Sequence, residues 1–120
     1  MVCRLISRWY ANRYGIEISW SSKIGRGLPL GHHVQSGGVV VNPHATIGDD
    51  CLLTHRVTIG AKDEAWPTLG NRVRVHTGAV LIGDVKIGDD VRIGANAVVT
   101  RDVPAGSTVV GIPARPISSD

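Results

Sequence analysis

Aliphatic residues recur at every sixth position along most of this chain, and glycine often follows them. The recurrence runs through Ile18, Ile24 and Leu30, then Val41, Ile47, Leu53 and Ile59, then Leu69, Val75, Leu81, Ile87, Ile93 and Val99. A period of six matches neither the 3.6-residue repeat of a helix nor the simple alternation of a long strand. It predicts short strands joined by turns, in which three units close one triangular coil of about 18 residues. We therefore expect an all-β fold, a parallel β-helix whose coils stack on one another.

Small or β-branched residues lie four positions after these aliphatic residues. They are Ala45, Cys51, Val57, Val73, Ala79, Val85, Val91 and Ala97. We expect the aliphatic side chains to point inward from flat faces and the small ones to fill the corners, which makes Cys51 a corner residue. Gly, Asn and Asp at the turns tolerate a positive φ. Successive coils should stack about 4.8 Å apart, so that the aliphatic ladders form one continuous core.

Two interruptions of the repeat should protrude as loops. The first break, Gly31–Gly38, adds five residues to the six-residue step, and the second, Ala61–Thr68, adds four. Loops that leave a rigid scaffold are common places for binding and catalysis. We therefore look for function near these two breaks.

Register places a set of side chains in one column if each break uses up one turn of the coil. Leu30, Leu53, Val75 and Ile93 then share a face, and His32, His55, Thr77 and Ala95 follow each of them by two residues. The column covers three coil steps, about 14 Å, which is comparable to the length of an extended pantetheine arm. The sequence thus predicts a groove for such an arm, with a histidine near its thioester end.

Composition narrows the class of protein. The chain has 120 residues, the size of one domain. Its formal charge is +3 without a run of Lys or Arg, so nucleic acid is not an expected partner. The stretch Met1–Tyr10 has arginines among its apolar residues, and no later segment reaches the length of a membrane span. We expect a cytoplasmic, soluble protein with a helical cap over residues 1–15 and the β-helix over residues 16–120.

Several stretches of the chain follow the pattern of a known family. They are Tyr14–Ile18, Leu30–His32, Val39–Pro43, Val57–Gly60, Pro67–Gly70, Ile93–Thr100 and Gly111–Arg115. From about Tyr14 to its end, the chain resembles serine acetyltransferases and their shorter relatives that O-acetylate sugars. The resemblance implies left-handed coils, a homotrimer with active sites between neighbouring subunits, acetyl-CoA as the donor and no metal. The hydroxyl of a small molecule would accept the acetyl group.

The resemblance also implies roles for individual residues. His32 matches the family's catalytic base, and Glu17 falls where that family has an Asp that orients the base. The acetyl-CoA groove is implied at Thr77, Gly78, Ala95, Thr100, Arg101 and Arg115, with His55 near the thioester end by register. A positioned imidazole can take the hydroxyl proton during attack on the thioester. A carboxylate on the other ring nitrogen stabilises the imidazolium. We expect direct transfer without an acyl-enzyme.

The sequence departs from the family pattern near the expected acceptor. Gly31 precedes His32 where serine acetyltransferases usually have an Asp, and Trp66 stands where they have a second His before a proline. The His-bearing loop is also longer, so His33 competes with His32 as the base. We assign His33 and Trp66 to the acceptor site. Gly31 and the short N-terminal region favour a sugar as the acceptor, whereas the overall resemblance of the loop favours serine.

The sequence also allows two other classes of protein, a zinc enzyme and a non-catalytic scaffold. A zinc enzyme built on a β-helix needs three histidines that converge on the metal. His32 and His55 share the column, but His76 is one residue out of phase with them. The other class is a non-catalytic trimeric scaffold or binding module, against which the glycine-rich loop around His32 argues.

Overall fold

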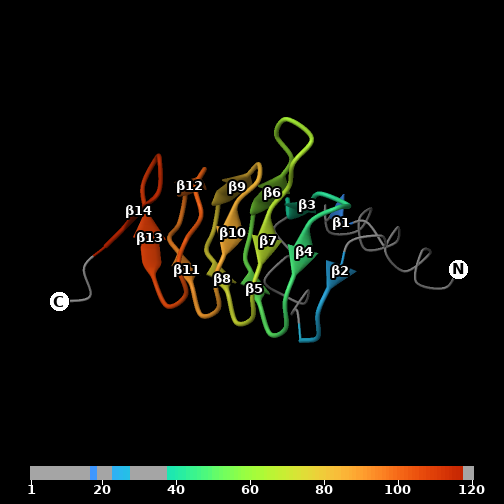
Figure 1. Cartoon of the computed structure of the whole chain (residues 1–120), viewed down its shortest axis with the longest axis horizontal. Helices are drawn as coiled ribbons and strands as arrows, with labels where there is room; N and C mark the ends of the chain where they lie inside the picture. The colour runs from blue at the N-terminus through green and yellow to red at the C-terminus, as the bar shows by residue number, and fades with distance from the viewer. Residues whose placement is uncertain (1–16, 19–22, 28–37, 118–120) are drawn as a thin grey trace, which may run out of the picture.

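The computed structural model describes residues 17–18, 23–27 and 38–117, which form short strands connected by turns (Figure 1). The strands are β1 (Glu17–Ile18), β2 (Lys23–Ile24), β3 (Val40–Val41), β4 (Thr46–Ile47), β5 (Leu52–Leu53), β6 (Thr58–Gly60), β7 (Thr68–Leu69), β8 (Arg74–Val75), β9 (Val80–Ile82), β10 (Lys86–Ile87), β11 (Arg92–Ile93), β12 (Val98–Val99), β13 (Thr108–Val110) and β14 (Arg115–Pro116). Each has two or three residues, so the predicted all-β class of short strands is confirmed. The predicted helical cap lies outside the described residues.

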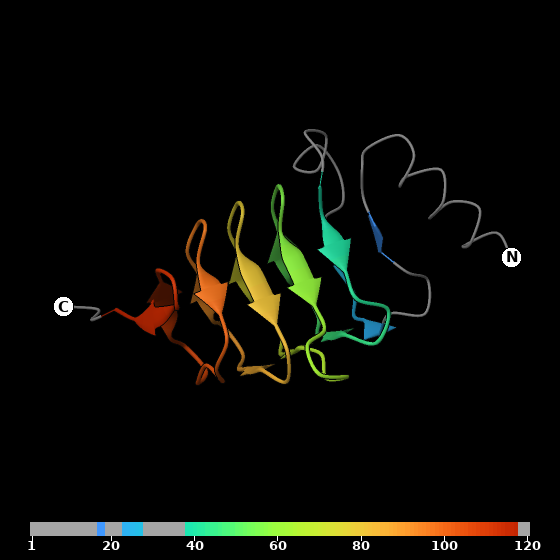
Figure 2. The same ribbon diagram turned by 90° about the horizontal axis from the view of Figure 1, so that it is seen from above.

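The strands build three sheets that run along the molecule. Sheet A has the order β1-β3-β6-β9-β12, sheet B the order β2-β4-β7-β10, and sheet C the order β5-β8-β11-β13-β14. Each strand from β3 to β9 pairs in parallel with the strand three places later in the chain. A chain that returns to the same sheet at every third strand is a β-helix, and Figure 2 shows its stacked coils from the side.

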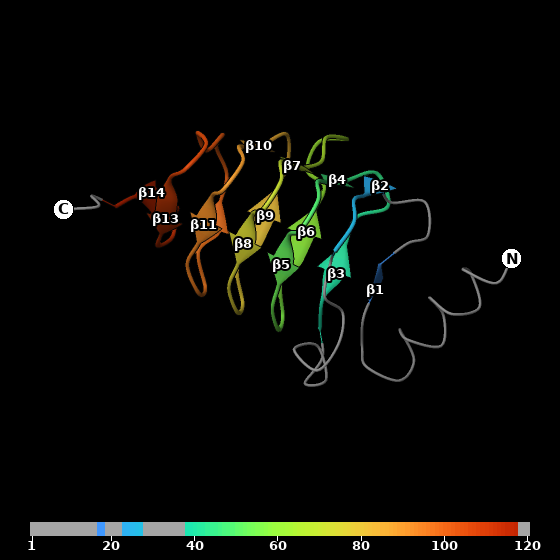
Figure 3. The ribbon, with the colours of Figure 1, turned by 90° about the horizontal axis from the view of Figure 1, so that it is seen from below.

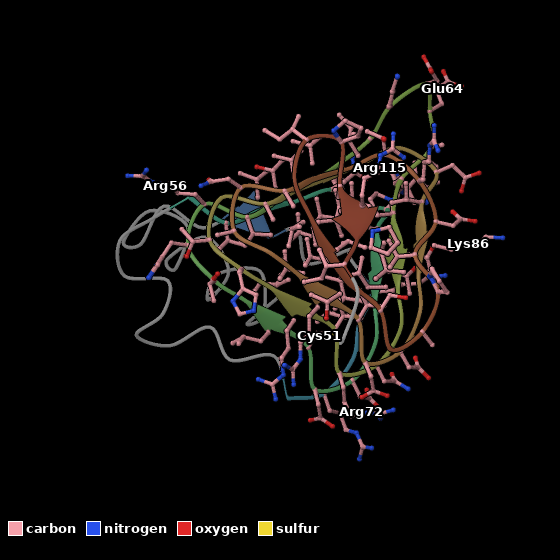
Figure 4. All side chains as sticks on the ribbon, turned by 90° about the vertical axis from the view of Figure 1, so that its left-hand side faces the viewer. Cys51, Arg56, Glu64, Arg72, Lys86 and Arg115 are labelled. Atoms are coloured by element: carbon pink, nitrogen blue, oxygen red, sulfur yellow. The ribbon has the colours of Figure 1, made fainter. Side chains whose placement is uncertain are left out.

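The turns fall at three corners, which we name after the sheets that they join. Figure 4 views the molecule along the coil axis and labels one residue near each corner. Arg72 lies at the B–C corner, Arg56 at the C–A corner, and Glu64 on the loop of the A–B corner. All three side chains point away from the interior, and no polar or charged side chain is buried among the described residues.

The core consists of the aliphatic and small residues that the six-residue period predicts. Every described aliphatic residue of the pattern from Val41 onward has an exposed fraction of 3% or less, and the eight predicted corner residues have 1% or less. Burial of one such Val, Leu or Ile side chain contributes about 1.5–3 kcal/mol. Cys51 belongs to this set, and burial raises the pKa of its thiol. The thiol lies 3.2 Å from the carbonyl oxygen of Gly70 and so fills the corner as predicted.

A ladder of Asp and Asn side chains holds the B–C corner. The side chain of Asp49 accepts a hydrogen bond from the backbone N–H of Arg26 at 2.9 Å. Asn71 accepts one from the N–H of Asp49 at 2.8 Å, and Asp89 one from the N–H of Asn71 at 2.7 Å. Each side chain therefore satisfies a backbone donor of the preceding coil, and the coils are linked at this corner by side chains as well as by the sheets.

The residues that follow this ladder adopt a positive φ. At the B–C corner they are Gly27, Asp50, Arg72, Asp90 and Gly106. Glycine and Asp were expected in this conformation, whereas Arg72, with φ +57°, was not. Its guanidinium makes two hydrogen bonds to the carboxylate of Asp90, at 2.7 and 3.1 Å, across neighbouring coils. Arg72 thus puts a long, paired side chain at a turn position where the sequence pattern favours Gly, Asn or Asp.

The second predicted loop, Ala61–Thr68, protrudes from the A–B corner, as Figures 1 and 3 show between β6 and β7. Lys62 and Ala65 exchange two backbone hydrogen bonds, at 2.8 and 3.0 Å. Asp63 and Glu64 between them have φ values of +52° and +59°. Two residues with positive φ inside a hydrogen-bonded pair make a tight hairpin turn of type I′. The loop is thus a defined hairpin. Of the first predicted loop, only Gly38 lies within the described residues.

The repeat continues past the point where the sequence pattern appeared to end. Val103 is 6% exposed and bridges Ile87 in parallel, so it occupies the inward position of sheet B after a step of four residues from Val99. Val109 then takes the next position on sheet C. Beyond it, β14 reverses direction and pairs antiparallel with β13. A period of six does not predict this shortened coil. In the part of the chain that the structure describes, no helix is long and apolar enough to cross a membrane.

Candidate functional site

The predicted column lies at the C–A corner. Parallel pairing aligns Leu53 with Val75 and Val75 with Ile93 on sheet C. The residues two positions later, His55, Thr77 and Ala95, therefore stand one above another in successive coils, which confirms this part of the predicted register. The first aligned position, with His32, lies outside the described residues.

Backbone hydrogen bonds join the coils along this column. The N–H of Gly78 donates to the carbonyl oxygen of His55 at 2.9 Å, and the N–H of Asn96 donates to that of Thr77 at 2.9 Å. Gly78 has a φ of +78°, and a Cβ at this position would come within 2.2 Å of the side-chain oxygen of Asn96. Glycine is therefore required here by its turn and by the neighbouring coil.

The side chains of the column are small, polar or exposed. Thr77 and Ala95 are exposed, and His55 is half-buried. The hydroxyl of Thr54, on the sheet C side of the column, donates to the carbonyl oxygen of Val75 at 3.1 Å. The same hydroxyl lies 3.4 Å from that of Thr77. The corner thus presents a narrow exposed strip, with hydroxyl groups near one end and a single methyl group, that of Ala95, in the next coil.

The other residues predicted for the donor groove lie further from the column. Thr100 and Arg101 follow β12, whereas Ala95 precedes it, so sheet A separates these two residues from the column within one chain. Arg115 is exposed on β14 at the C-terminal end. Figure 4 labels it on the far side of the coil from Arg72. Within one chain, the structure brings neither arginine to the column, and their assignment stays a prediction.

The structure describes only part of the predicted catalytic residues. The backbone of Glu17 forms β1 and pairs with Val40 of sheet A, but its side chain lies outside the description, as do His32 and His33 entirely. Among the described residues, no three His, Cys, Asp or Glu side chains gather as a metal site would require.

Trp66, which we predicted for the acceptor site, stacks on a residue that the sequence analysis did not select. The rings of Trp66 and His44 have centroids 4.7 Å apart and planes inclined by 33°. Trp66 is 38% exposed, so part of the indole faces the surroundings. The backbone N–H of His44 donates to the side chain of Asn42 at 2.9 Å, which fixes its turn. Both rings lie at the A–B corner of adjacent coils, a proximity that the loop length hid in the sequence.

A pair of arginines on sheet C was also missed by sequence reasoning. Parallel register places Arg74 directly beside Arg92, and both side chains are exposed on the outer face of the sheet. The signal was present as two arginines that each precede an inward aliphatic residue by one position. By contrast, Arg72 is paired, and its guanidinium holds the pKa of the Asp90 carboxyl below its usual range.

Comparison with known proteins agrees with this fold. Residues 67–101 match the family described as Bacterial transferase hexapeptide (six repeats), so this segment carries the repeats of the hexapeptide transferases. It is also 47% identical, over 99% of its length, to a serine acetyltransferase of Helicobacter pylori strain J99, of which it covers 70%. The chain therefore belongs to the serine acetyltransferase family, and the predicted resemblance is confirmed.

Solved structures show the same architecture. The soybean serine acetyltransferase apoenzyme superposes with a TM-score of 0.82 at 33% identity, covering 93% of this chain and 47% of that one. A serine acetyltransferase in complex with CoA gives a TM-score of 0.82 at 26% identity, covering 97% and 48%. The coils are left-handed, as the resemblance implied. The chain spans about half the length of these two solved proteins.

Proposed function

We propose that this protein transfers an acetyl group from acetyl-CoA to the hydroxyl of a small acceptor. The observation that carries the proposal is the 47% identity to a serine acetyltransferase across almost the whole chain. The regular C–A column supports it, because its described part, His55, Thr77 and Ala95, forms a partly exposed strip along which a pantetheine arm can lie. Serine is the acceptor that the family membership favours.

In the proposed reaction, the imidazole of His32 takes the proton of the acceptor hydroxyl while the hydroxyl oxygen attacks the thioester carbon. The carbon–sulfur bond then breaks, and the protonated imidazole gives its proton to the sulfur, so that CoA leaves as the thiol. Glu17 orients the imidazole and stabilises its protonated form. General-base assistance of this kind contributes about 10²- to 10⁴-fold to a rate.

The donor groove is proposed along His55, Thr77, Gly78 and Ala95. Gly78 has no side chain and Ala95 has only a methyl group, so both leave room for an arm that lies against the coils. Thr100, Arg101 and Arg115 complete the groove in the proposal. Because Arg101 lies across sheet A from the column in one chain, its part in the groove requires a neighbouring subunit. A homotrimer with active sites between subunits meets this requirement.

The acceptor side of the proposed site includes His33 and Trp66. The exposed part of the Trp66 indole, held against His44, offers a rigid wall on which an acceptor can pack. Trp66 protrudes from the A–B corner and would reach the base of another subunit in the trimer. We propose that the reaction takes place in the cytoplasm, where acetyl-CoA is present.

The test is release of CoA thiol from acetyl-CoA by the intact protein, with serine and a panel of sugars as acceptors. We expect turnover with serine that falls about 10²- to 10⁴-fold in His32→Ala. His33→Ala is the matched comparison, because it removes the same imidazole one position later. Since His33 is proposed for the acceptor side, this variant should raise the KM for the acceptor and keep most of kcat. A reversed pattern would make His33 the base. Thiol release with none of the acceptors, together with no binding of CoA, would favour a non-catalytic scaffold.

A further inference from the structure

The outer face of sheet C carries two arginines in direct register. Leu52, Arg74, Arg92 and Thr108 form one outward row, because each is the pairing partner of the next. Adjacent strands lie about 4.8 Å apart, so the first side-chain atoms of Arg74 and Arg92 are near neighbours. Like charges in directly opposed positions destabilise a sheet. An anion bound between the two guanidinium groups would offset this repulsion.

The described part of the chain does not supply this anion. The outward residues of β5, β8 and β11, and those that follow each strand, are Leu52, Thr54, Arg74, His76, Arg92 and Gly94, and none is acidic. Within the described residues, neither Arg74 nor Arg92 makes an ion pair or a side-chain hydrogen bond. Arg72, only two residues before Arg74, is instead fully engaged by the carboxylate of Asp90. Arg72 is thus neutralised within the protein, whereas Arg74 has no acidic partner among the described residues.

We propose that Arg74 and Arg92 bind phosphate groups of the acyl donor, coenzyme A. This inference rests on the proposed function and adds two binding residues to it. The planar guanidinium matches the oxygens of a phosphate with two parallel hydrogen bonds. Arg74 precedes Thr77 by three residues and Arg92 precedes Ala95 by three, which places both about 10 Å from the column along the strand direction.

One residue with an outward position lies between each arginine and the column. In the coil of Arg92 it is Gly94, which has no side chain of its own and lies against the side chain of Val110. In the coil of Arg74 it is His76, which is exposed on the same face and adds a further donor. Both arginines therefore lie within reach of the phosphorylated end of a donor whose arm is held along the column. That proximity selects the donor rather than an unrelated anion as the occupant.

The test compares binding of CoA, dephospho-CoA and pantetheine by isothermal titration calorimetry. The proteins are the intact chain, Arg74→Gln and Arg92→Gln. A charge-assisted hydrogen bond of this kind corresponds to a loss of about 10- to 100-fold in CoA affinity when one arginine is removed. Pantetheine lacks phosphates, so its affinity should stay within about twofold of the intact chain. Dephospho-CoA separates the 3′-phosphate from the pyrophosphate, because an arginine that binds the 3′-phosphate no longer matters once that group is removed.

Two control variants exclude a general effect of charge. Lys86→Gln removes one positive charge from sheet B, on a different side of the coil, as Figure 4 shows. Arg72→Gln removes one from the B–C corner, two residues from Arg74. Neither should weaken CoA binding more than about twofold. Circular dichroism melting of each variant verifies that the fold is intact.

The outcomes separate this inference from the proposed function. CoA affinities of Arg74→Gln and Arg92→Gln equal to that of the intact chain would overturn the inference and leave the proposed function in place. An equal loss of pantetheine binding would also overturn it, because the arginines would then act through the structure. Failure of the intact chain to bind either CoA or pantetheine would overturn the proposed function and this inference together.

Discussion

The B–C corner and the C–A corner turn the same chain between flat sheets, yet they use their side chains differently. At both corners, a backbone N–H donates to a carbonyl of the preceding coil, as Arg72 does to Asp49 and Gly78 does to His55. Only the B–C corner adds a ladder of side chains that accept hydrogen bonds from the backbone. The side chains of Asp49, Asn71 and Asp89 are thus engaged within the protein. The C–A corner, held by its backbone, leaves Thr77 and Ala95 exposed for one.

This comparison predicts that changes at the B–C corner affect stability and that changes on sheet C affect binding. The difference arises because the ladder residues satisfy groups within the protein, whereas the exposed residues of sheet C satisfy few or none.

Gly48→Ala should cause the largest loss of stability at the B–C corner. The new Cβ would lie 2.4 Å from the backbone carbonyl oxygen of Gly70, which a neighbouring coil holds in place. Overpacking against a fixed backbone costs about 3 kcal/mol of the free energy of unfolding. Urea denaturation measures the loss. Gly60→Ala is the matched control, since its Cβ meets only Thr58 at 3.9 Å. Equal stability of the two variants would contradict the geometry of this corner.

Asn71→Ala should cost about 1–2 kcal/mol, because it leaves the N–H of Asp49 without its acceptor. Asn71→Asp keeps an acceptor oxygen but places a third negative charge between Asp49 and Asp89. We expect its smaller loss of stability to recover as salt is added, since salt screens exposed charges. Denaturation of both variants at low and high salt is the measurement. A loss in Asn71→Asp that is unaffected by salt would argue against charge repulsion in the ladder.

Arg74→Gln should raise the free energy of unfolding by about 0.5 kcal/mol, because it removes a like charge beside Arg92. The same variant is expected to bind CoA less tightly, so stability and binding would change in opposite directions. Thermal melting without ligand measures the first effect. A variant that loses stability would show that Arg74 has a partner within the fold, and the contrast between the two corners would then fail on sheet C.

Arg72→Gln should have the smallest effect, and that effect should depend on pH. The Arg72 guanidinium, which donates hydrogen bonds to the Asp90 carboxylate, lowers the pKa of that carboxyl below its ordinary value. The pair therefore stabilises the fold above that value, and its contribution disappears as the pH falls through the lowered pKa. Both side chains are exposed, so the difference in melting temperature from the intact chain should be slight near pH 7. It should vanish near pH 2. A difference that grows on acidification would contradict the sign of the pKa shift.

The candidate site was predicted unevenly, and the reasons are physical. Thr77 and Ala95 could be aligned from the sequence because the step of six is regular between Leu69 and Ile93, so counting residues amounts to counting coils. His55 could be added because the second break was taken to use up one turn of the coil, which the register of Leu53 and Val75 confirms. The stacking of His44 and Trp66 could not be predicted, because the hairpin at Lys62–Ala65 takes up residues without advancing the coil. Residues separated by an irregular loop become neighbours only when the length absorbed by that loop is known.

The sequence by itself determined the β-helix, its buried ladders and the phase of its column. It could do so because hydrophobic periodicity is local information that every coil repeats. The tertiary structure alone decided that Val103 enters the core after a short step, that Arg72 is neutralised by Asp90, and that Arg74 stands unpaired beside Arg92. These facts depend on contacts between neighbouring coils, 16 or 18 residues apart, where the partner of a charge is set by register and by the geometry of each turn.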